Sequence, residues 1–316
     1  MDTALDILGI TGPIYLSIAL GYLATRHGLF RSDDLPVLSR FTLQIALPAL
    51  LFNALSQRQV AEIFNLQYLG AYAAGSLLVV AAGLWWARKL QGHSLSYSSM
   101  MAMGMSCPNS GFVGYPIMLL TLGPVAGVAL ALNMIVENLL LIPLLLAVAD
   151  SGGQTGQWRQ VLRQTLKGLC LNPMIWGIVG GFAWSLSGLH LPAPVARTMN
   201  LFAGASGAIA LFVIGGSLVG LQVQGLRGTV LQIALGKLVL HPLVMWAMLV
   251  WVFPVADPAL RSAALISGAL PMLGIYTIFS QRHGHGAISA ATLLVTTVGS
   301  FFTLSALLWA LQHGAF

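Results

Sequence analysis

The stretch MAMGMSCPNSGFVGYPIML (residues 101–119) decides the fold. It is apolar enough to cross a membrane, yet Pro108 cannot donate a backbone hydrogen bond, and Gly111 and Gly114 relax the helix further. Backbone groups freed in this way are not tolerated in lipid, so the stretch must face protein or a water-filled cavity. The sequence therefore predicts a broken helix inside a membrane protein.

A second stretch of the same kind, ALPMLGIYTIF (residues 269–279), contains Pro271 and Gly274. Both stretches share the spacing Pro-x-x-Gly, and the second lies 163 residues after Pro108 and Gly111. Two interrupted apolar segments at corresponding places in two halves of a chain are typical of the binding site of a secondary transporter. The alternative is a pair of ordinary proline kinks.

Composition places the whole chain in a membrane. Hydrophobic residues make up 57% of the 316 residues, charged residues 7%, and the mean hydropathy is +0.86. Soluble proteins carry roughly 25% charged residues, because their surface must be solvated. The net charge of +6 does not indicate a nucleic-acid partner, since the Lys and Arg residues fall mostly in short loops between apolar runs. We expect the lipid bilayer as the partner of this surface, and neither a metal ion nor a cofactor.

The apolar runs predict an all-α integral membrane protein of ten helices, because a helix needs roughly 20 apolar residues to cross the hydrocarbon. The predicted spans cover 7–25, 36–56, 67–87, 97–122, 125–149, 172–187, 195–221, 229–253, 259–279 and 287–311. Residues 1–150 form a first five-helix repeat, 151–168 a cytoplasmic linker, and 169–316 a second, inverted five-helix repeat. Together they make a single membrane domain.

Loop charges predict the orientation of the spans. One set of loops holds ten cations (Arg26, Arg31, Arg40, Arg88, Lys89, Arg159, Arg163, Lys167, Arg227 and Arg282), and the opposite set holds three (Arg58, Arg197 and Arg261). Loops rich in Lys and Arg stay in the cytoplasm. The sequence therefore predicts that both termini lie outside the cytoplasm, in the inner membrane of a bacterium.

The two halves of the chain match each other at a fixed offset. Pro13, Gly21, Gly28 and Leu29 recur 160 residues later, at Pro173, Gly181, Gly188 and Leu189. Leu51-Phe52 and Leu211-Phe212 keep the same offset. Because each half has an odd number of spans, the two copies have opposite orientation in the membrane, which is the arrangement of alternating-access transporters.

The motif Asn109-Ser110-Gly111-Phe112-Val113-Gly114-Tyr115-Pro116 resembles the N-x-x-x-x-G-x-P crossover of the auxin efflux carrier family. LPALLF (47–52), Asn172-Pro173 and Ala269-Leu270-Pro271 are similar to that family too. The resemblance implies crossing helices 4 and 9, a scaffold of spans 1, 2, 6 and 7, and a small organic anion as cargo. It places the substrate at the crossing, where the candidate residues are Pro108, Asn109, Ser110, Gly111, Pro271, Gly274 and Tyr276.

Polar residues inside the spans are further candidates, because such residues are costly in lipid and are functional by default. Glu137, with Asn138 beside it, is either a protonatable coupling site or a buried group that fixes helix packing. Lys237 and His241 share a helix face. They attract the anion, pair with Glu137, or serve structure through snorkelling and hydrogen bonds. Asn53 lines the scaffold side of a cavity or bonds between helices.

These features favour a secondary carrier that moves a small organic anion, by alternating access, over proteins of other classes. A membrane-embedded enzyme would need a catalytic constellation, and Gly204-Ala205-Ser206-Gly207 lacks the spacing of a nucleophile elbow. A channel is the second alternative, against which the paired broken helices argue. We expect no enzymatic activity, and we expect that the scaffold helices can form a homodimer.

Overall fold

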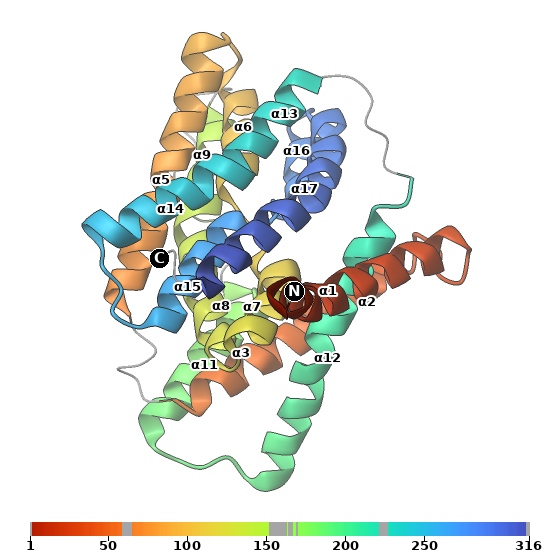
Figure 1. Cartoon of the computed structure of the whole chain (residues 1–316), viewed down its shortest axis with the longest axis vertical. Coiled ribbons are helices and arrows are strands. Elements are labelled where there is room, and N and C mark those ends of the chain that lie inside the picture. The colour runs from red at the N-terminus through yellow and green to blue at the C-terminus, as the bar shows by residue number, and fades with distance from the viewer. Residues whose placement is uncertain are drawn as a thin grey trace. The chain divides into compact units, whose positions relative to one another are not determined.

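The structure, a computed structural model, describes residues 2–58, 65–151, 163, 167–168, 170–220 and 227–313. Every named element in these residues is a helix, as the composition predicts (Figure 1). Most of the linker predicted over 151–168 lies outside the described residues. The chain groups into two compact units, and each unit is described by itself.

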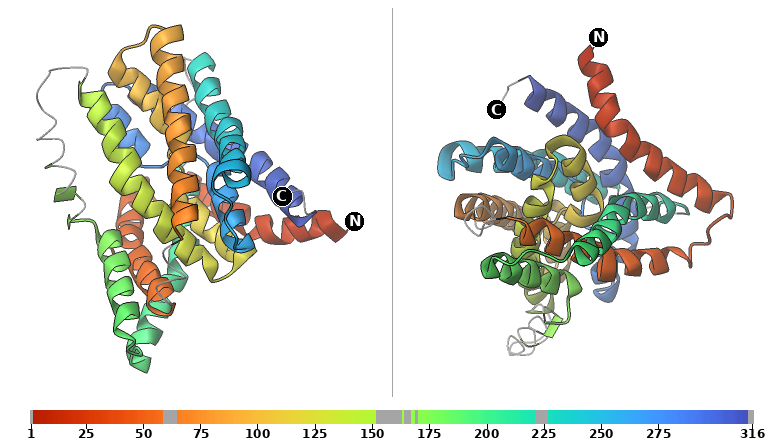
Figure 2. Two further views of the ribbon diagram at one scale, coloured as in Figure 1. Left: turned by 90° about the vertical axis from the view of Figure 1, so that its left-hand side faces the viewer. Right: turned by 90° about the horizontal axis from the view of Figure 1, so that it is seen from below.

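Unit 1 comprises Met1–Asn65, Ser110–Leu132 and Cys170–Gly220. Its helices are α1 (Asp2–Arg26), α2 (Leu35–Phe41), the π-helical turn η1 (Thr42–Ala46), α3 (Leu47–Ser56), the π-helical turn η3 (Ser110–Gly114), α7 (Tyr115–Leu122), the first part of α8 (Val125–Val136), α11 (Pro173–Ser187) and α12 (Ala193–Ser217). α1 packs on α12, and α3 packs on α11. Figures 1 and 2 show α3 and α11 side by side.

Glycines allow both of these helix pairs to approach closely. A Cβ at Gly21 of α1 would strike the carbonyl group of Phe212 of α12. A Cβ at Gly181 of α11 would lie 2.8 Å from the carbonyl oxygen of Phe52 of α3. Small residues at such contacts let two backbones meet, which is the usual packing of membrane helices.

Unit 2 comprises Leu66–Asn109, Asn133–Leu169 and Leu221–Phe316. Its helices are α5 (Leu66–Trp85), η2 (Trp86–Leu90), α6 (Leu95–Ser106), the end of α8, η4 (Glu137–Leu141), α9 (Ile142–Ser151), α13 (Arg227–Leu235), η5 (Gly236–Leu240), α14 (His241–Ala247), η6 (Met248–Val252), α15 (Pro258–Ala269), α16 (Tyr276–Arg282) and α17 (Gly286–Gln312).

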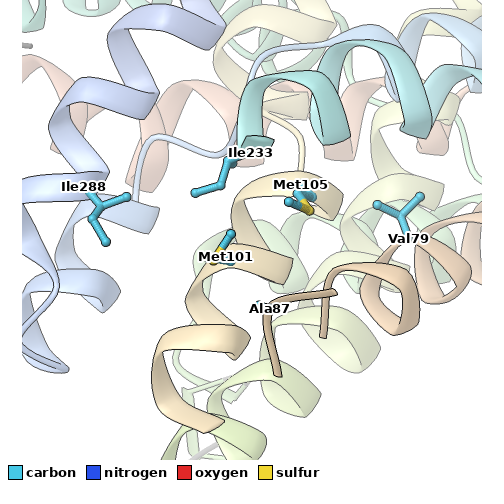
Figure 3. Packing of buried hydrophobic residues seen from close by; sticks show 6 residues of the cluster. All are labelled: Val79, Ala87, Met101, Met105, Ile233 and Ile288. Carbon is cyan, nitrogen blue, oxygen red and sulfur yellow. The ribbon is translucent and has the colours of Figure 1, made fainter. Parts of the chain in front are cut away.

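An apolar cluster surrounds α6 in unit 2. Met101 and Met105 lie one helical turn apart on α6, and Figure 3 shows them with side chains of α5, η2, α13 and α17 around them. The other members are Val79, Ala87, Ile233 and Ile288. The unbranched Met side chains fill the irregular space between these helices, as Met does in many cores. The methionines of α6 therefore serve packing.

Four π-helical turns end two residues before a proline. η1, η3, η4 and η5 precede Pro48, Pro116, Pro143 and Pro242. Because proline lacks an N–H group, the carbonyl one turn earlier has no regular partner, and the helix adjusts locally. π-turns of this kind are frequent at functional sites. Glu137 lies in η4 and Lys237 in η5.

Six helices in the described part of the chain are long and apolar enough to cross a membrane. They are Leu35–Ser56, Leu66–Leu90, Val125–Ser151, Ala193–Ser217, Gly228–Val252 and Ile288–Gln312. The other four predicted spans, 7–25, 97–122, 172–187 and 259–279, fall on α1, on α11 and on the two interrupted segments. The chain is thus a multi-pass membrane protein, and the count of ten spans stays a prediction.

Candidate functional site

The first interruption lies between α6 and η3. The side-chain oxygen of Ser94 accepts a hydrogen bond from the backbone N–H of Tyr97 and caps the start of α6. The helix ends at Ser106, and Cys107 is extended, with φ −95° and ψ 110°. Extended backbone is expected before proline, since the ring of Pro108 disfavours the helical conformation of the residue before it.

The second interruption lies between α15 and α16 and has the same cause. Asp257 caps the start of α15 by accepting hydrogen bonds from the N–H groups of Ala259 (2.8 Å) and Leu260 (3.2 Å). Leu270, which precedes Pro271, is extended, with φ −62° and ψ 154°. Each interruption is therefore a proline break with a capped helix before it.

The two interruptions pair with each other inside unit 2. The backbone N–H of Asn109 donates to the carbonyl of Pro271, and the N–H of Leu273 donates to the carbonyl of Cys107, both over 2.9 Å. Pro108 and Met272 form an antiparallel β-bridge at the same place. These bonds satisfy backbone groups that the broken helices leave open, which is obligatory in a membrane.

Side chains around this pairing come from both interruptions. A Cβ at Gly274 would lie 3.7 Å from Nδ2 of Asn109, so the Asn109 amide lies beside Gly274. Tyr276 is 1% exposed, and its hydroxyl lies 3.7 Å from the position of a Cβ on Gly104 of α6. The structure thus brings together four predicted substrate residues, which are Pro108, Asn109, Pro271 and Gly274, and it places the Tyr276 side chain against α6.

Three other predicted residues belong to unit 1. Ser110 and Gly111 begin η3, directly after Asn109 in the chain. Asn53 of α3 donates to the side chain of Asn200 over 2.7 Å and accepts from Gln57 over 2.6 Å. The bond between Asn53 and Asn200 joins two helices, which favours the structural interpretation of Asn53.

Polar residues on one face of α5 contact Glu137 and His241, two other candidate residues of unit 2. Tyr68, Tyr72 and Ser76 follow one another at intervals of four residues and therefore share a helix face. Tyr68 donates to Oδ1 of Asn133 over 2.8 Å, and Tyr72 donates to Oε1 of Glu137 over 2.7 Å. Glu137 is 1% exposed, so its carboxyl group is buried and hydrogen-bonded.

Ser76 begins a second arm of this network. Its hydroxyl lies 3.1 Å from Nε2 of His241, and Nδ1 of His241 lies 2.8 Å from the Lys237 ammonium. Lys237 donates further to the carbonyl oxygen of Gly268 over 2.8 Å. Because Lys237 is 0% exposed, its ammonium does not reach the surface, and the snorkelling interpretation is wrong. Buried hydrogen bonding, the other structural interpretation, describes what the side chain does.

Asn138 bonds within its own helix, since its Nδ2 donates to the carbonyl of Met134 over 2.9 Å. The sequence interpretation did not single out Tyr68, Tyr72, Ser76 or Ser267. A usable signal was present, because polar side chains at i, i+4 and i+8 of an otherwise apolar span share one face. Among the described residues, no group of three or more His, Cys, Asp or Glu side chains could hold a metal ion.

Comparison with known proteins gives the family. A family model described as "Membrane transport protein" matches residues 11–309. A protein of Rhizobium meliloti (strain 1021), named "Putative malonate transporter", is 28% identical over 98% of this chain and 97% of its own length. "Uncharacterized transporter YfdV" of Escherichia coli (strain K12) is 26% identical over 94% of each chain.

A plant protein matches over a shorter region. "Auxin efflux carrier component 3a" of Oryza sativa subsp. japonica is 27% identical over 125 residues, which are 38% of this chain and 20% of that protein. The match of the family model covers most of the chain, and the plant relative bears the name that the crossover motif suggests. The chain therefore belongs to the auxin efflux carrier family of membrane transport proteins.

Proposed function

We propose that this protein is a secondary carrier for a small organic anion, of which a carboxylate such as malonate is the best candidate. The observation on which the proposal depends is the backbone pairing between Asn109 and Pro271, where two interrupted helices meet. Paired interrupted helices form the binding sites of many secondary transporters. One relative that matches nearly the whole chain is named for malonate.

The chemistry of the pairing suits an anion. The helix Ser110–Leu122 starts directly after Asn109, and the first N–H groups of a helix have no partner within it and hold a partial positive charge. An anion can bind such groups without a cationic side chain. We assign the substrate contacts to Pro108, Asn109, Ser110, Gly111, Pro271, Gly274 and Tyr276.

The architecture we propose is ten helices in two inverted repeats, with helices 4 and 9 crossing and both termini outside the cytoplasm of a bacterium. The glycine contacts of unit 1 support it. Gly21 packs on Phe212, and Gly181 packs on Phe52. Under the repeat offset of 160 residues, Gly21 corresponds to Gly181 and Phe52 corresponds to Phe212. The two contacts are therefore the same contact, seen once from each repeat. Such a reciprocal contact is expected of two inverted copies.

Two alternatives make different predictions. Substrate inside the vesicles would not accelerate uptake through a channel, whereas a carrier exchanges internal for external substrate. A membrane-embedded enzyme would change its substrate chemically. The family and the paired interruptions favour the carrier, and we propose no catalysis, no cofactor and no nucleic-acid partner. A homodimer through the scaffold helices is part of the same proposal.

Reconstitution in proteoliposomes tests the function. Purified protein is tested for uptake of labelled malonate, malate, succinate and acetate, with the neutral analogue malonamide as a control and with pH or Na⁺ gradients imposed separately. We expect saturable uptake of at least one carboxylate, acceleration by the same carboxylate inside the vesicles, and recovery of the substrate unchanged. Uptake of malonamide alone, or no uptake of any carboxylate above that of empty liposomes, contradicts the proposal.

A further inference from the structure

Two hydrogen-bonded arms meet at the last turn of α15. In one arm, Asn133 donates from Nδ2 to the hydroxyl of Ser267 over 2.8 Å. In the other arm, Lys237 donates to the carbonyl of Gly268 over 2.8 Å. Ser267 and Gly268 are neighbours in the chain and lie just before the interruption at Pro271. Two different helices therefore hold the same turn.

The end of α15 needs such partners. The carbonyl groups of Ser267 and Gly268 would accept from the N–H groups of residues 271 and 272 in a continued helix. Pro271 has no N–H group, and Met272 has left the helix for the β-bridge with Pro108. Lys237 supplies the missing donor to Gly268. Without Lys237, the buried carbonyl oxygen of Gly268 would lose this hydrogen bond, which is costly at a helix end.

Both arms are anchored on α5. Ser76 contacts His241, and His241 contacts Lys237, at 3.1 and 2.8 Å. Tyr68 donates to Asn133 two helical turns earlier on the same face. Every one of these side chains is 0% exposed. In a close-packed interior, such a chain of hydrogen bonds restricts the position of the last turn of α15.

We propose that Lys237 is a positioning residue of the transport site. It holds the end of α15 and thereby the segment after it, which pairs with Asn109. The inference rests on the proposed carrier function. When its amine is protonated, Lys237 also places a positive charge opposite the partial negative charge of the α15 C-terminus, which would otherwise repel an anion bound nearby. The ionisable groups that interact with Lys237 are His241, Glu137 and Cys107, and Glu137 is hydrogen-bonded to Tyr72.

Cys107 gives a readout that does not depend on transport. Its side chain is 0% exposed, and its carbonyl accepts from Leu273 in the pairing. In a Cys170→Ser background, Cys107 is the only cysteine, so its rate of alkylation by a maleimide depends on how often the pairing opens. A positive charge near a thiol makes it more reactive, so loss of the Lys237 charge would by itself slow alkylation, and more frequent opening is what raises the rate. Replacing Lys237 with Met removes the donor and the charge, and Lys237→Arg restores both.

We expect Lys237→Met to raise the alkylation rate of Cys107 by about tenfold, since one hydrogen bond to a charged group is lost. Lys237→Arg should change it by less than about threefold, because charge and donor remain. Thr292→Ala is the matched control, since within the described residues that buried hydroxyl donates to the carbonyl of Ile288 on its own helix and to no other helix. An alkylation rate in Lys237→Met equal to that of wild type overturns the inference.

Binding of malonate to the same variants completes the test. We expect Lys237→Met to bind about tenfold more weakly and Lys237→Arg to recover most of the affinity. Should Lys237→Met not fold, Lys237→Gln replaces it, since its shorter side chain has no charge and reaches less far towards the carbonyl of Gly268. An alkylation rate for the Gln variant no higher than that of the Arg variant then overturns the inference. Failure of wild-type protein to bind any carboxylate contradicts the carrier function instead, and the alkylation rates still decide the role of Lys237.

Discussion

The backbone N–H of Asn109 donates to the carbonyl of Pro271 across 162 positions of sequence, over 2.9 Å. This bond uses the main chain of Asn109 and leaves its side chain beside Gly274. The main chain of Asn109 therefore contributes to the pairing of the two interruptions, and its amide group lies beside the second of them. A substitution at Asn109 can separate the contribution of the main chain from that of the amide group.

Asn109→Ala is expected to weaken carboxylate binding without lowering expression. The backbone bond to Pro271 persists, whereas the amide that faces the second interruption is lost. One hydrogen bond to a charged ligand contributes about 1.5–3 kcal/mol, which corresponds to about ten- to hundredfold in Kd. Titration of purified protein with malonate measures the change.

Gln44→Ala is the control for this substitution, because Gln44 lies exposed in η1 of unit 1. It should change the affinity by far less than Asn109→Ala. An Asn109→Ala protein that binds carboxylates as wild type does would place the substrate site elsewhere.

The interruptions themselves could be predicted from the sequence, because proline acts locally. Pro108 and Pro271 each remove one N–H group and disfavour helix in the residue before them, whatever the rest of the chain does. Helix boundaries near them follow, and the structure places the ends of α6 and α15 two residues before each proline. The four spans that the family resemblance assigns to the scaffold fall in unit 1, although residues 110–132 join them there.

The contacts between helices could not be predicted, because they depend on which faces meet. The sequence shows Lys237, His241 and Glu137 as polar residues in spans, and one interpretation paired Lys237 with Glu137. In the structure, Glu137 accepts a hydrogen bond from Tyr72, and Lys237 is hydrogen-bonded to His241 and Gly268. Glu137 also interacts electrostatically with Lys237, in the way that this interpretation predicts. His241 lies one helical turn after Lys237, so the spacing did indicate this contact. The other partner of Lys237 is a backbone carbonyl, and any residue type carries one, so no sequence pattern could indicate it.

Gly215→Ala is expected to destabilise the protein. A Cβ at Gly215 of α12 would strike the carbonyl of Ile18 of α1, and neither backbone can move without disturbing its helix. Overpacking of this kind costs about 1–3 kcal/mol. Thermal unfolding in detergent should show a lower midpoint than wild type. Gly204→Ala on the same helix is the control, since a Cβ there meets no atom within 4 Å, and equal midpoints of the two variants would contradict the proposed contact.

His285 is expected to make the stability of unit 2 depend on pH. Burial, with a smaller effect of His283, lowers the pKa of His285 from 6.5, and within the described residues its Nε2 has no hydrogen-bond partner. The folded state therefore disfavours the charged ring, so this contribution is complete above about pH 6.5 and is lost as the pH falls towards the lowered pKa. The thermal midpoint of wild type should fall on acidification, and that of His285→Gln should fall less. Identical pH dependence of the two midpoints would exclude this role for His285.

Both chain termini are expected outside the cytoplasm, because the loop cations divide ten to three. Cys107 and Cys170 are first replaced, and a single cysteine is then introduced at Asp2 in one protein and at Phe316 in another. Phe316 lies outside the residues that the structure describes. Both should react with a membrane-impermeant maleimide on intact cells. A cysteine at either terminus that reacts only after lysis would refute the ten-span orientation.

Glu137→Gln is expected to abolish the pH dependence of uptake if the carboxyl group exchanges a proton during transport. The variant should still fold, because the glutamine oxygen can accept the bond that Tyr72 donates to Oε1 of Glu137 over 2.7 Å. Tyr72→Phe is the matched control, since it removes the donor and keeps the carboxyl group, so uptake by this variant should still depend on pH. The profiles come from initial rates of malonate uptake, measured over the range from about pH 5 to about pH 8. A Glu137→Gln profile that matches wild type would make Glu137 a packing residue, and low stability of the same variant would favour a buried pair with Lys237.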